Sequence, residues 1–130
     1  MTRFAIDAAV ALRLIREGRR PADQHQLVAP AGLRSEVLAR LYREVRAGRL
    51  AEAEARRQLD DLAGLKIRLL SDRVSRSTAW KIATELGWAE IGPAEYLAVA
   101  ALQADALVTE DDRLTSQSRV PLAGYADLFR

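Results

Sequence analysis

The sequence has no cysteine, a single histidine and no long apolar run. The lack of cysteine excludes a disulfide framework and thiolate zinc sites, and one histidine, His25, excludes histidine-rich metal sites and most Ser-His catalysis. Any catalytic metal must therefore bind oxygen ligands. No apolar run reaches the roughly 18 residues of a membrane helix or resembles the apolar segment of a secretory signal. We therefore expect a cytoplasmic protein with no membrane partner.

The glycines and the net charge also fail to indicate a function. The seven glycines are scattered along the chain and form no phosphate-binding loop. The formal net charge is only +2, so charge alone gives weak support for a nucleic-acid partner. Apolar residues, by contrast, make up 49% of the 130 residues, which is enough for one buried core. We expect a single domain over residues 1–130.

Short apolar segments alternate with helical patterns along the chain. The expected strands lie at residues 4–6, 26–28, 66–70 and 106–108. The expected helices run from Asp7 to Gly18, from Leu33 to Gly48, over 50–63, from Asp72 to Gly87, and from Gly92 to a point before the last strand. Short apolar strands separated by helices are typical of a parallel sheet covered on both faces. The pattern predicts an α/β fold, a three-layer α/β/α sandwich with a central parallel sheet.

Acidic residues follow three of these segments. Asp7 comes directly after the first strand, Asp111 lies three residues beyond the last strand, and Glu36 lies in the first turns of the helix after the second strand. In open parallel sheets the ligand site lies beyond the carboxyl ends of the strands. Converging carboxylates repel one another, and Mg²⁺ or Mn²⁺ relieves this repulsion because these ions prefer oxygen ligands. A metal-bound water could then attack a phosphate ester.

Each of these acids also has a purely structural explanation. Asp7 can cap the helix that follows it, and Glu36 can pair with Arg40 at i,i+4. Thr109 can cap a short helix whose first turn contains residues 110–112, all of them acidic. The residues alone leave both explanations open.

Three stretches of sequence resemble a known family when taken together. They read FAIDAAVALRLIREG, VAPAGLRSEVLARLYREVRAGRL and AEYLAVAALQADALVTEDDRL. In order and spacing they resemble the PIN-domain nucleases, and most closely the VapC-type toxins of bacterial toxin–antitoxin pairs. The most specific part is a tyrosine followed by Leu-Ala-x-Ala, which leads to a strand ending in LVTxD and then Arg-Leu.

The resemblance implies a fold, an activity and partners. The family has an α/β/α sandwich around a parallel sheet, with clustered acids that bind Mg²⁺ or Mn²⁺ and cleave single-stranded RNA. Its members form homodimers and are inhibited by a small VapB-like antitoxin protein. Position by position, Asp7, Glu36 and Asp111 match the family's acids and are the expected catalytic and metal-binding residues.

Two positions depart from the family pattern. A hydroxyl residue usually follows the first acid, where this chain has Ala8, and a third acid usually stands where this chain has Pro93. Glu95 or Glu90 is the alternative source of a further metal ligand. The sequence therefore leaves two functions open: a metal-dependent ribonuclease, or a catalytically weakened PIN-like domain that binds RNA or a partner protein without cleaving.

A phosphodiester substrate would need cations beside the acids. Arg13, Arg16 and Arg113 are the candidates for contacting RNA, although arginines in so charged a chain also serve as solvated helix faces. Trp80 and Trp88 could stack on bases. Because the chain has only two Trp, three Tyr and two Phe, we expect both tryptophans to pack against the core instead.

Overall fold

The computed structural model describes all 130 residues and contains a four-stranded parallel sheet. The strands are β1 (Arg3–Ile6), β2 (Gln26–Pro30), β3 (Ile67–Leu70) and β4 (Ala106–Val108). Their order across the sheet is β3-β2-β1-β4, and every neighbouring pair is parallel. Because β4 pairs with β1 on the side away from β2, it forms one edge of the sheet, and the carboxyl ends of the first and last strands lie side by side there.

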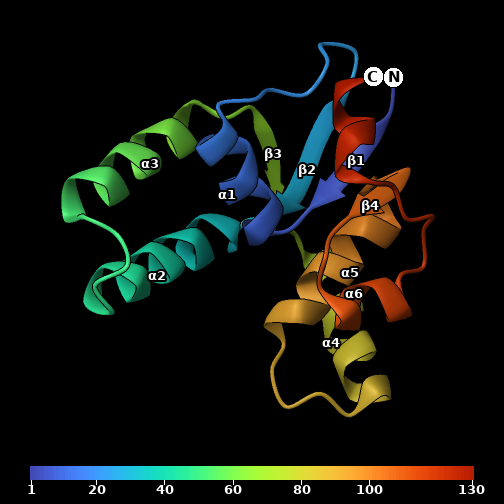
Figure 1. Cartoon of the computed structure of the whole chain (residues 1–130). Helices are drawn as coiled ribbons and strands as arrows, with labels where there is room; N and C mark the ends of the chain where they lie inside the picture. Colours follow the sequence, from blue (N-terminus) through green and yellow to red (C-terminus); the bar gives the residue numbers. More distant parts are fainter.

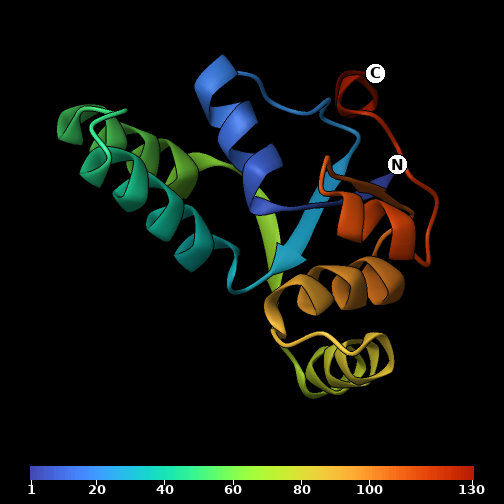
Figure 2. The same ribbon diagram turned by 60° about the horizontal axis from the view of Figure 1, so that its bottom comes forward.

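Helices cover both faces of this sheet (Figures 1 and 2). They are α1 (Ala8–Glu17), α2 (Leu33–Arg46), α3 (Glu52–Gly64), α4 (Arg73–Leu86), α5 (Gly92–Gln103) and α6 (Asp112–Gln117), with a final 3₁₀ turn η1 (Tyr125–Phe129). Helices α1, α2 and α3 contact one another on one side, and α5 contacts α4, α6, β1 and β2 on the other. The predicted three-layer α/β/α sandwich with a central parallel sheet is confirmed.

One cluster of 30 buried residues forms the core. Strand β4 is buried throughout, whereas β3 is a half-exposed edge. Helix α5 is buried on most sides, as its nearly uniform apolar sequence predicts. Leu102 in its last turn is exposed, and Pro93 and Glu95 in its first turn are partly exposed. None of the helices combines the length and apolarity needed to span a membrane.

The second strand is longer than its apolar pattern predicts. The expected strand covers residues 26–28, but Ala29 and Pro30 also pair, with Leu69 and Leu70 of β3. A proline is tolerated here because it stands at the end of the strand, where one missing backbone donor interrupts no further pairing. The extension carries the chain directly to α2, the helix that contains Glu36.

Helix α4 begins with a reciprocal cap, as the sequence predicts from Ser71 or Asp72. The Asp72 carboxylate accepts a hydrogen bond from the Ser75 backbone N–H at 2.8 Å, and the Ser75 hydroxyl accepts from the Asp72 backbone N–H at 3.1 Å. These bonds satisfy backbone donors that the first turn of a helix leaves free.

We expect Asp72→Ala to lower the melting temperature by roughly 3 to 5 °C, because alanine cannot accept the capping bond. Asp72→Asn should retain most of the stability, since asparagine is an equally good cap. Thermal unfolding followed by circular dichroism measures both. An alanine variant that melts with the wild type would show that the cap contributes nothing.

Candidate active site

Asp7 is the buried carboxylate at the carboxyl end of β1. Only 7% of the residue is exposed. Its Oδ1 accepts a hydrogen bond from the Val10 backbone N–H at 2.9 Å, so Asp7 does cap α1. Its Oδ2 accepts from the Thr109 hydroxyl. Asp7 therefore caps α1 with one carboxylate oxygen, as its structural explanation predicts. Its other oxygen faces the end of the neighbouring strand β4.

Thr109 joins the ends of β1 and β4. While its hydroxyl donates to Asp7, the same oxygen accepts a hydrogen bond from the Asp111 backbone N–H at 3.0 Å. The alternative that Thr109 caps α6 is wrong, because Asp111 is the cap and accepts from the Arg113 backbone N–H at 2.8 Å. One hydroxyl thus fixes the position of Asp7 relative to the loop that carries Asp111.

Glu36 lies in α2, the helix that follows the neighbouring strand β2, and its carboxylate is held by two donors. The Tyr96 hydroxyl donates to its Oε1 at 3.2 Å, and Arg40 Nε donates to its Oε2 at 3.0 Å, which confirms the i,i+4 pair. Burial is the main cause that raises the pKa of Tyr96, and the nearby carboxylates of Glu36 and Asp7 raise it further. The phenol therefore stays neutral and remains a hydrogen-bond donor to Glu36.

Asp111 is bound to an arginine within its own loop. Arg113 donates through Nε to Oδ1 at 3.3 Å and through Nη2 to Oδ2 at 3.0 Å. This hydrogen-bonded guanidinium keeps the pKa of Asp111 below its usual range. The pKa of Arg113 is raised in turn, chiefly by Asp111 and more weakly by Glu90 and Glu36. Asp111 is therefore the ion-pair partner of Arg113, and Glu90 lines the same pocket as this arginine.

The side chains of Asp7, Glu36 and Asp111 offer the oxygen ligands that a divalent ion prefers, but the three carboxylates are not grouped around one point. All candidate donors are oxygens, which Mg²⁺ and Mn²⁺ prefer. However, no three acids are grouped closely enough to hold one ion. Instead, Arg40 and Arg113 meet the charges of Glu36 and Asp111. Since Mg²⁺ is commonly held by one or two protein carboxylates and several waters, the arrangement suits at most two protein carboxylates on one ion.

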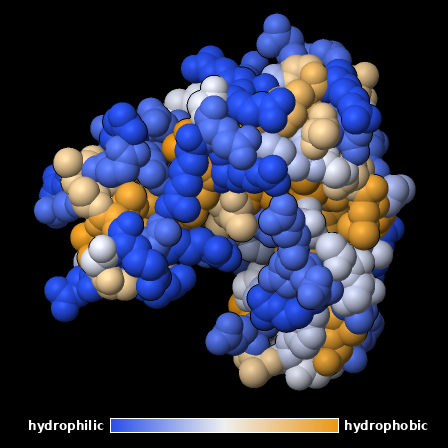
Figure 3. All heavy atoms as spheres, viewed as in Figure 1, coloured by the Kyte–Doolittle hydropathy of each residue, from blue (hydrophilic) through white to orange (hydrophobic).

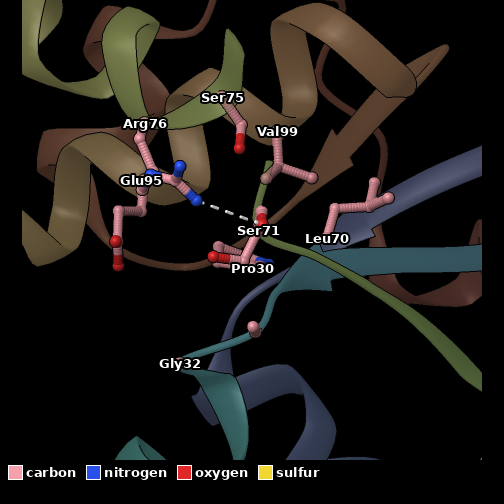
Figure 4. Close-up of a pocket in the computed structure, with 9 residues that line it drawn as sticks. Pro30, Gly32, Leu70, Ser71, Ser75, Arg76, Glu95 and Val99 are labelled. Carbon is pink, nitrogen blue, oxygen red and sulfur yellow. Dashed lines mark hydrogen bonds between the residues drawn. The ribbon is translucent and has the colours of Figure 1, made fainter. Parts of the chain in front are cut away.

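Glu95 and Glu90, the alternative sources of a further ligand, lie in two different pockets. Glu95 and Arg76 line a small pocket of about 20 Å³ at the carboxyl ends of β2 and β3 (Figure 4). The Oε2 atom of Glu95 lies 3.7 Å from the point that a Cβ at Gly32 would occupy. Asp7, Glu36 and Asp111 do not line this pocket. Glu90 lines another pocket with Arg113. Neither residue completes a group of three acids.

The arginines predicted to contact substrate all have acidic partners in the structure. Arg13 pairs with Glu110 at 3.0 Å and its guanidinium lies 3.8 Å from the centre of the Tyr125 ring. Arg16 pairs with Glu44, and Arg113 with Asp111. All three pairs are partly exposed, so each is weak enough for a phosphate to compete with the acid.

The two tryptophans differ in their surroundings. Trp88 is half-buried and packs against the core, as predicted. Trp80 on α4 is 72% exposed, so the packing role predicted for it is wrong. Trp88 also lines a pocket together with Glu90 and Arg113, the arginine that holds Asp111.

A hollow in the surface separates two groups of helices. Figure 3 shows it between the part of the molecule formed by α2 and α3 and the part formed by α4, α5 and α6. Helices α2 and α5, which border the hollow, supply Glu36 and Tyr96 (Figure 1). An extended polar ligand could therefore approach the acids from solvent.

Sequence reasoning missed the roles of Thr109 and Tyr96. The sequence did hold a signal for the tyrosine, because a phenol on an otherwise apolar, buried helix must find a hydrogen-bond partner. No comparable signal identified Thr109 as the link between two strands, since that role depends on which strands are neighbours.

Comparisons with known proteins support the fold. No protein-family model matches the chain, and no curated protein matches it. Among solved structures, PAE2754 from Pyrobaculum aerophilum aligns with a TM-score of 0.77 and 23% identity, over 98% of this chain and 92% of the other. VapBC2 from Rickettsia felis, solved with a DNA fragment from its promoter, aligns with a TM-score of 0.69 and 10% identity, over 94% of this chain and 98% of the other. At these identities the likeness shows the fold alone, and that fold is PIN-like.

Proposed function

We propose that this chain is a metal-dependent endoribonuclease that hydrolyses single-stranded RNA. The observation that carries the proposal is the buried Asp7 carboxylate at the junction of β1 and β4, joined through Thr109 to the Asp111 loop. Ligand sites of open parallel sheets lie at such a junction. Glu36, which accepts from the Tyr96 hydroxyl, lies in the helix after β2, so the three acids follow three adjacent strands of the sheet.

In this proposal Asp7 is the central metal ligand, with Glu36 or Asp111 as the second carboxylate. The bound Mg²⁺ or Mn²⁺ would supply an activated water and stabilise negative charge on the phosphate. Thr109 orients the Asp7 carboxylate, and the Tyr96 hydroxyl orients Glu36. Arg40 and Arg113, which balance the acids in the free protein, lie where they can bind phosphate oxygens of the substrate.

The hollow between the two groups of helices favours a single strand as the substrate. A single strand can bend into a hollow between two helical layers, whereas a duplex is stiff and wide. We expect the protein to cut a labelled single-stranded RNA with Mg²⁺ at least about tenfold faster than the same RNA annealed to its complement. Equal cutting of both substrates would contradict the choice of substrate, and no cutting of either would contradict the proposed activity.

We also propose that the protein acts as the toxin of a toxin–antitoxin pair, with a VapB-like antitoxin partner and a homodimeric state. The similar fold of VapBC2 supports this. A second support is the exposed apolar pair Leu38 and Tyr42, four residues apart on the same face of α2, since such side chains suit a protein contact. Replacing both with serine should weaken such an assembly while preserving the core.

A second candidate function is RNA or protein binding without cleavage. It is favoured by the internal arginine partners of Glu36 and Asp111 and by Pro93, which cannot bind a metal. This candidate predicts that RNA binding survives chelation of divalent ions and that no RNA is cut when Mg²⁺ is added. The cleavage assay above therefore separates the two.

A further inference from the structure

A pocket of about 370 Å³ lies next to the candidate active site on the side of α5. We call it the Trp88 pocket, and its lining residues are Gly87, Trp88, Ala89, Glu90, Pro93 and Arg113. Its volume falls within the range of about 300–1,000 Å³ that is typical of pockets for small ligands. Because Arg113 also holds Asp111, the pocket shares a wall with the carboxylate site.

The apolar part of the pocket comes from Trp88 and Pro93. Trp88 packs against the core and follows directly on the end of α4, where its backbone N–H donates to the Ala83 carbonyl at 2.9 Å. The packing against the core holds the indole in place without ligand, which lowers the entropy lost when a base stacks on it. Pro93 adds an uncharged ring in the first turn of α5. An indole presents a flat face on which any base can stack.

The polar part of the pocket comes from Arg113 and Glu90. Arg113 uses Nε and Nη2 to hold Asp111, and its Nη1 makes no bond within the chain, so donors remain for a phosphate. Glu90 is exposed and forms no ion pair within 4 Å. A carboxylate accepts hydrogen bonds from the amino groups of bases, as in its pairing with the cytosine N4 amino group. Adenine and cytosine carry such an amino group, whereas uracil does not.

Resting on the function proposed above, we propose that the Trp88 pocket binds one base of the single-stranded RNA next to the cleaved phosphodiester and prefers bases that carry an amino group. In this arrangement the base stacks on Trp88, Glu90 accepts from its amino group, and Arg113 binds the adjoining phosphate. Pro93 stands where the PIN-domain pattern has a third acid. In this chain it would instead form one wall of the base pocket.

The proposed base pocket can be tested by measuring the binding of fluorescein-labelled hexanucleotides. Excess chelator in the assay prevents cleavage of the RNA. We expect the wild-type chain to bind hexaadenylate and hexacytidylate at least about threefold more tightly than hexauridylate. Trp88→Leu keeps an apolar side chain against the core but removes the stacking surface, so it should weaken hexaadenylate binding about tenfold. Trp80→Leu is the matched control, because Trp80 lies outside the pocket, and its binding should stay within about twofold of wild type.

Glu90→Ala gives a second test that does not disturb the core, since Glu90 is exposed. This variant should lose the preference for adenine and cytosine over uracil.

In a Trp80→Phe chain, quenching of the remaining Trp88 fluorescence by hexaadenylate would place the base on the indole. Unchanged hexaadenylate affinity in Trp88→Leu, or an equal loss in Trp80→Leu, would overturn the pocket. Failure to cut RNA with Mg²⁺ would overturn the proposed ribonuclease, which is a separate result.

Discussion

Replacing Asp7 with asparagine is expected to lower the rate of RNA cleavage at least about 100-fold, with the fold intact. The substitution removes the negative charge from the only predicted metal ligand that is buried. An amide oxygen binds a divalent cation far less strongly than a carboxylate does. Glu36 and Asp111 cannot compensate, because Arg40 and Arg113 already share their charges.

The same substitution preserves the structural role of Asp7. Asparagine caps helices as well as aspartate does, so its amide oxygen can still accept from the Val10 backbone N–H. The Thr109 hydroxyl can rotate to accept from the new amide group. Circular dichroism and the melting temperature should therefore match the wild type closely.

Asp112→Asn is the matched control for Asp7→Asn. It removes one negative charge from the exposed first turn of α6 without changing a predicted metal ligand. We expect its cleavage rate to stay within about twofold of wild type. Should Asp7→Asn cut RNA as fast as Asp112→Asn, the catalytic role of Asp7 would be wrong.

Leu107→Ala is expected to reduce the free energy of unfolding by about 2–5 kcal/mol. Leu107 is the central residue of β4 and has no exposed surface, so its loss leaves a cavity between the sheet and its helices. A cost of this size is a large part of the about 5–15 kcal/mol that stabilises an ordinary domain. The strand that positions Thr109 and Asp111 would be weakened at the same time.

Leu122→Ala is the matched control for Leu107→Ala, because it makes the same change at an exposed position. Leu122 forms an isolated bridge with Leu107 but is 52% exposed. Its truncation should cost well under half as much as Leu107→Ala, because most of the removed surface already faces water. Urea unfolding of both variants measures the difference. Equal costs would mean that β4 is not packed as the structure describes.

Local sequence patterns predicted most of the fold. Each strand is a short apolar run, and helices α1 and α4 end at Gly18 and Gly87, which adopt positive φ angles of 62° and 69°. Periodicity and glycine placement are local properties, so they are readable from the chain. The extra length of β2 was not readable, because Ala29 and Pro30 become strand residues only through pairing with β3.

The candidate site was predictable only in part. The link from Asp7 through Thr109 to the Asp111 backbone depends on β1 and β4 being neighbours, and the sequence allowed this order without requiring it. The partners of the acids were harder still. Tyr96 and Glu36 are 60 positions apart in the chain, so their hydrogen bond depends on how α2 and α5 pack. Arg113 is close to Asp111 in sequence, but only the side-chain geometry shows that it holds both carboxylate oxygens.

We propose that the acids at the β1–β4 junction cleave RNA with the help of a divalent ion. The most direct test follows one labelled single-stranded RNA in a reaction started with Mg²⁺, stopped with excess chelator and restarted with excess Mn²⁺. We expect the wild-type chain to cut the RNA, to stop on chelation and to resume with Mn²⁺, and we expect no such cutting by Asp7→Asn at any stage. Cutting that continues through chelation, or an Asp7→Asn chain that follows the wild type, would contradict it.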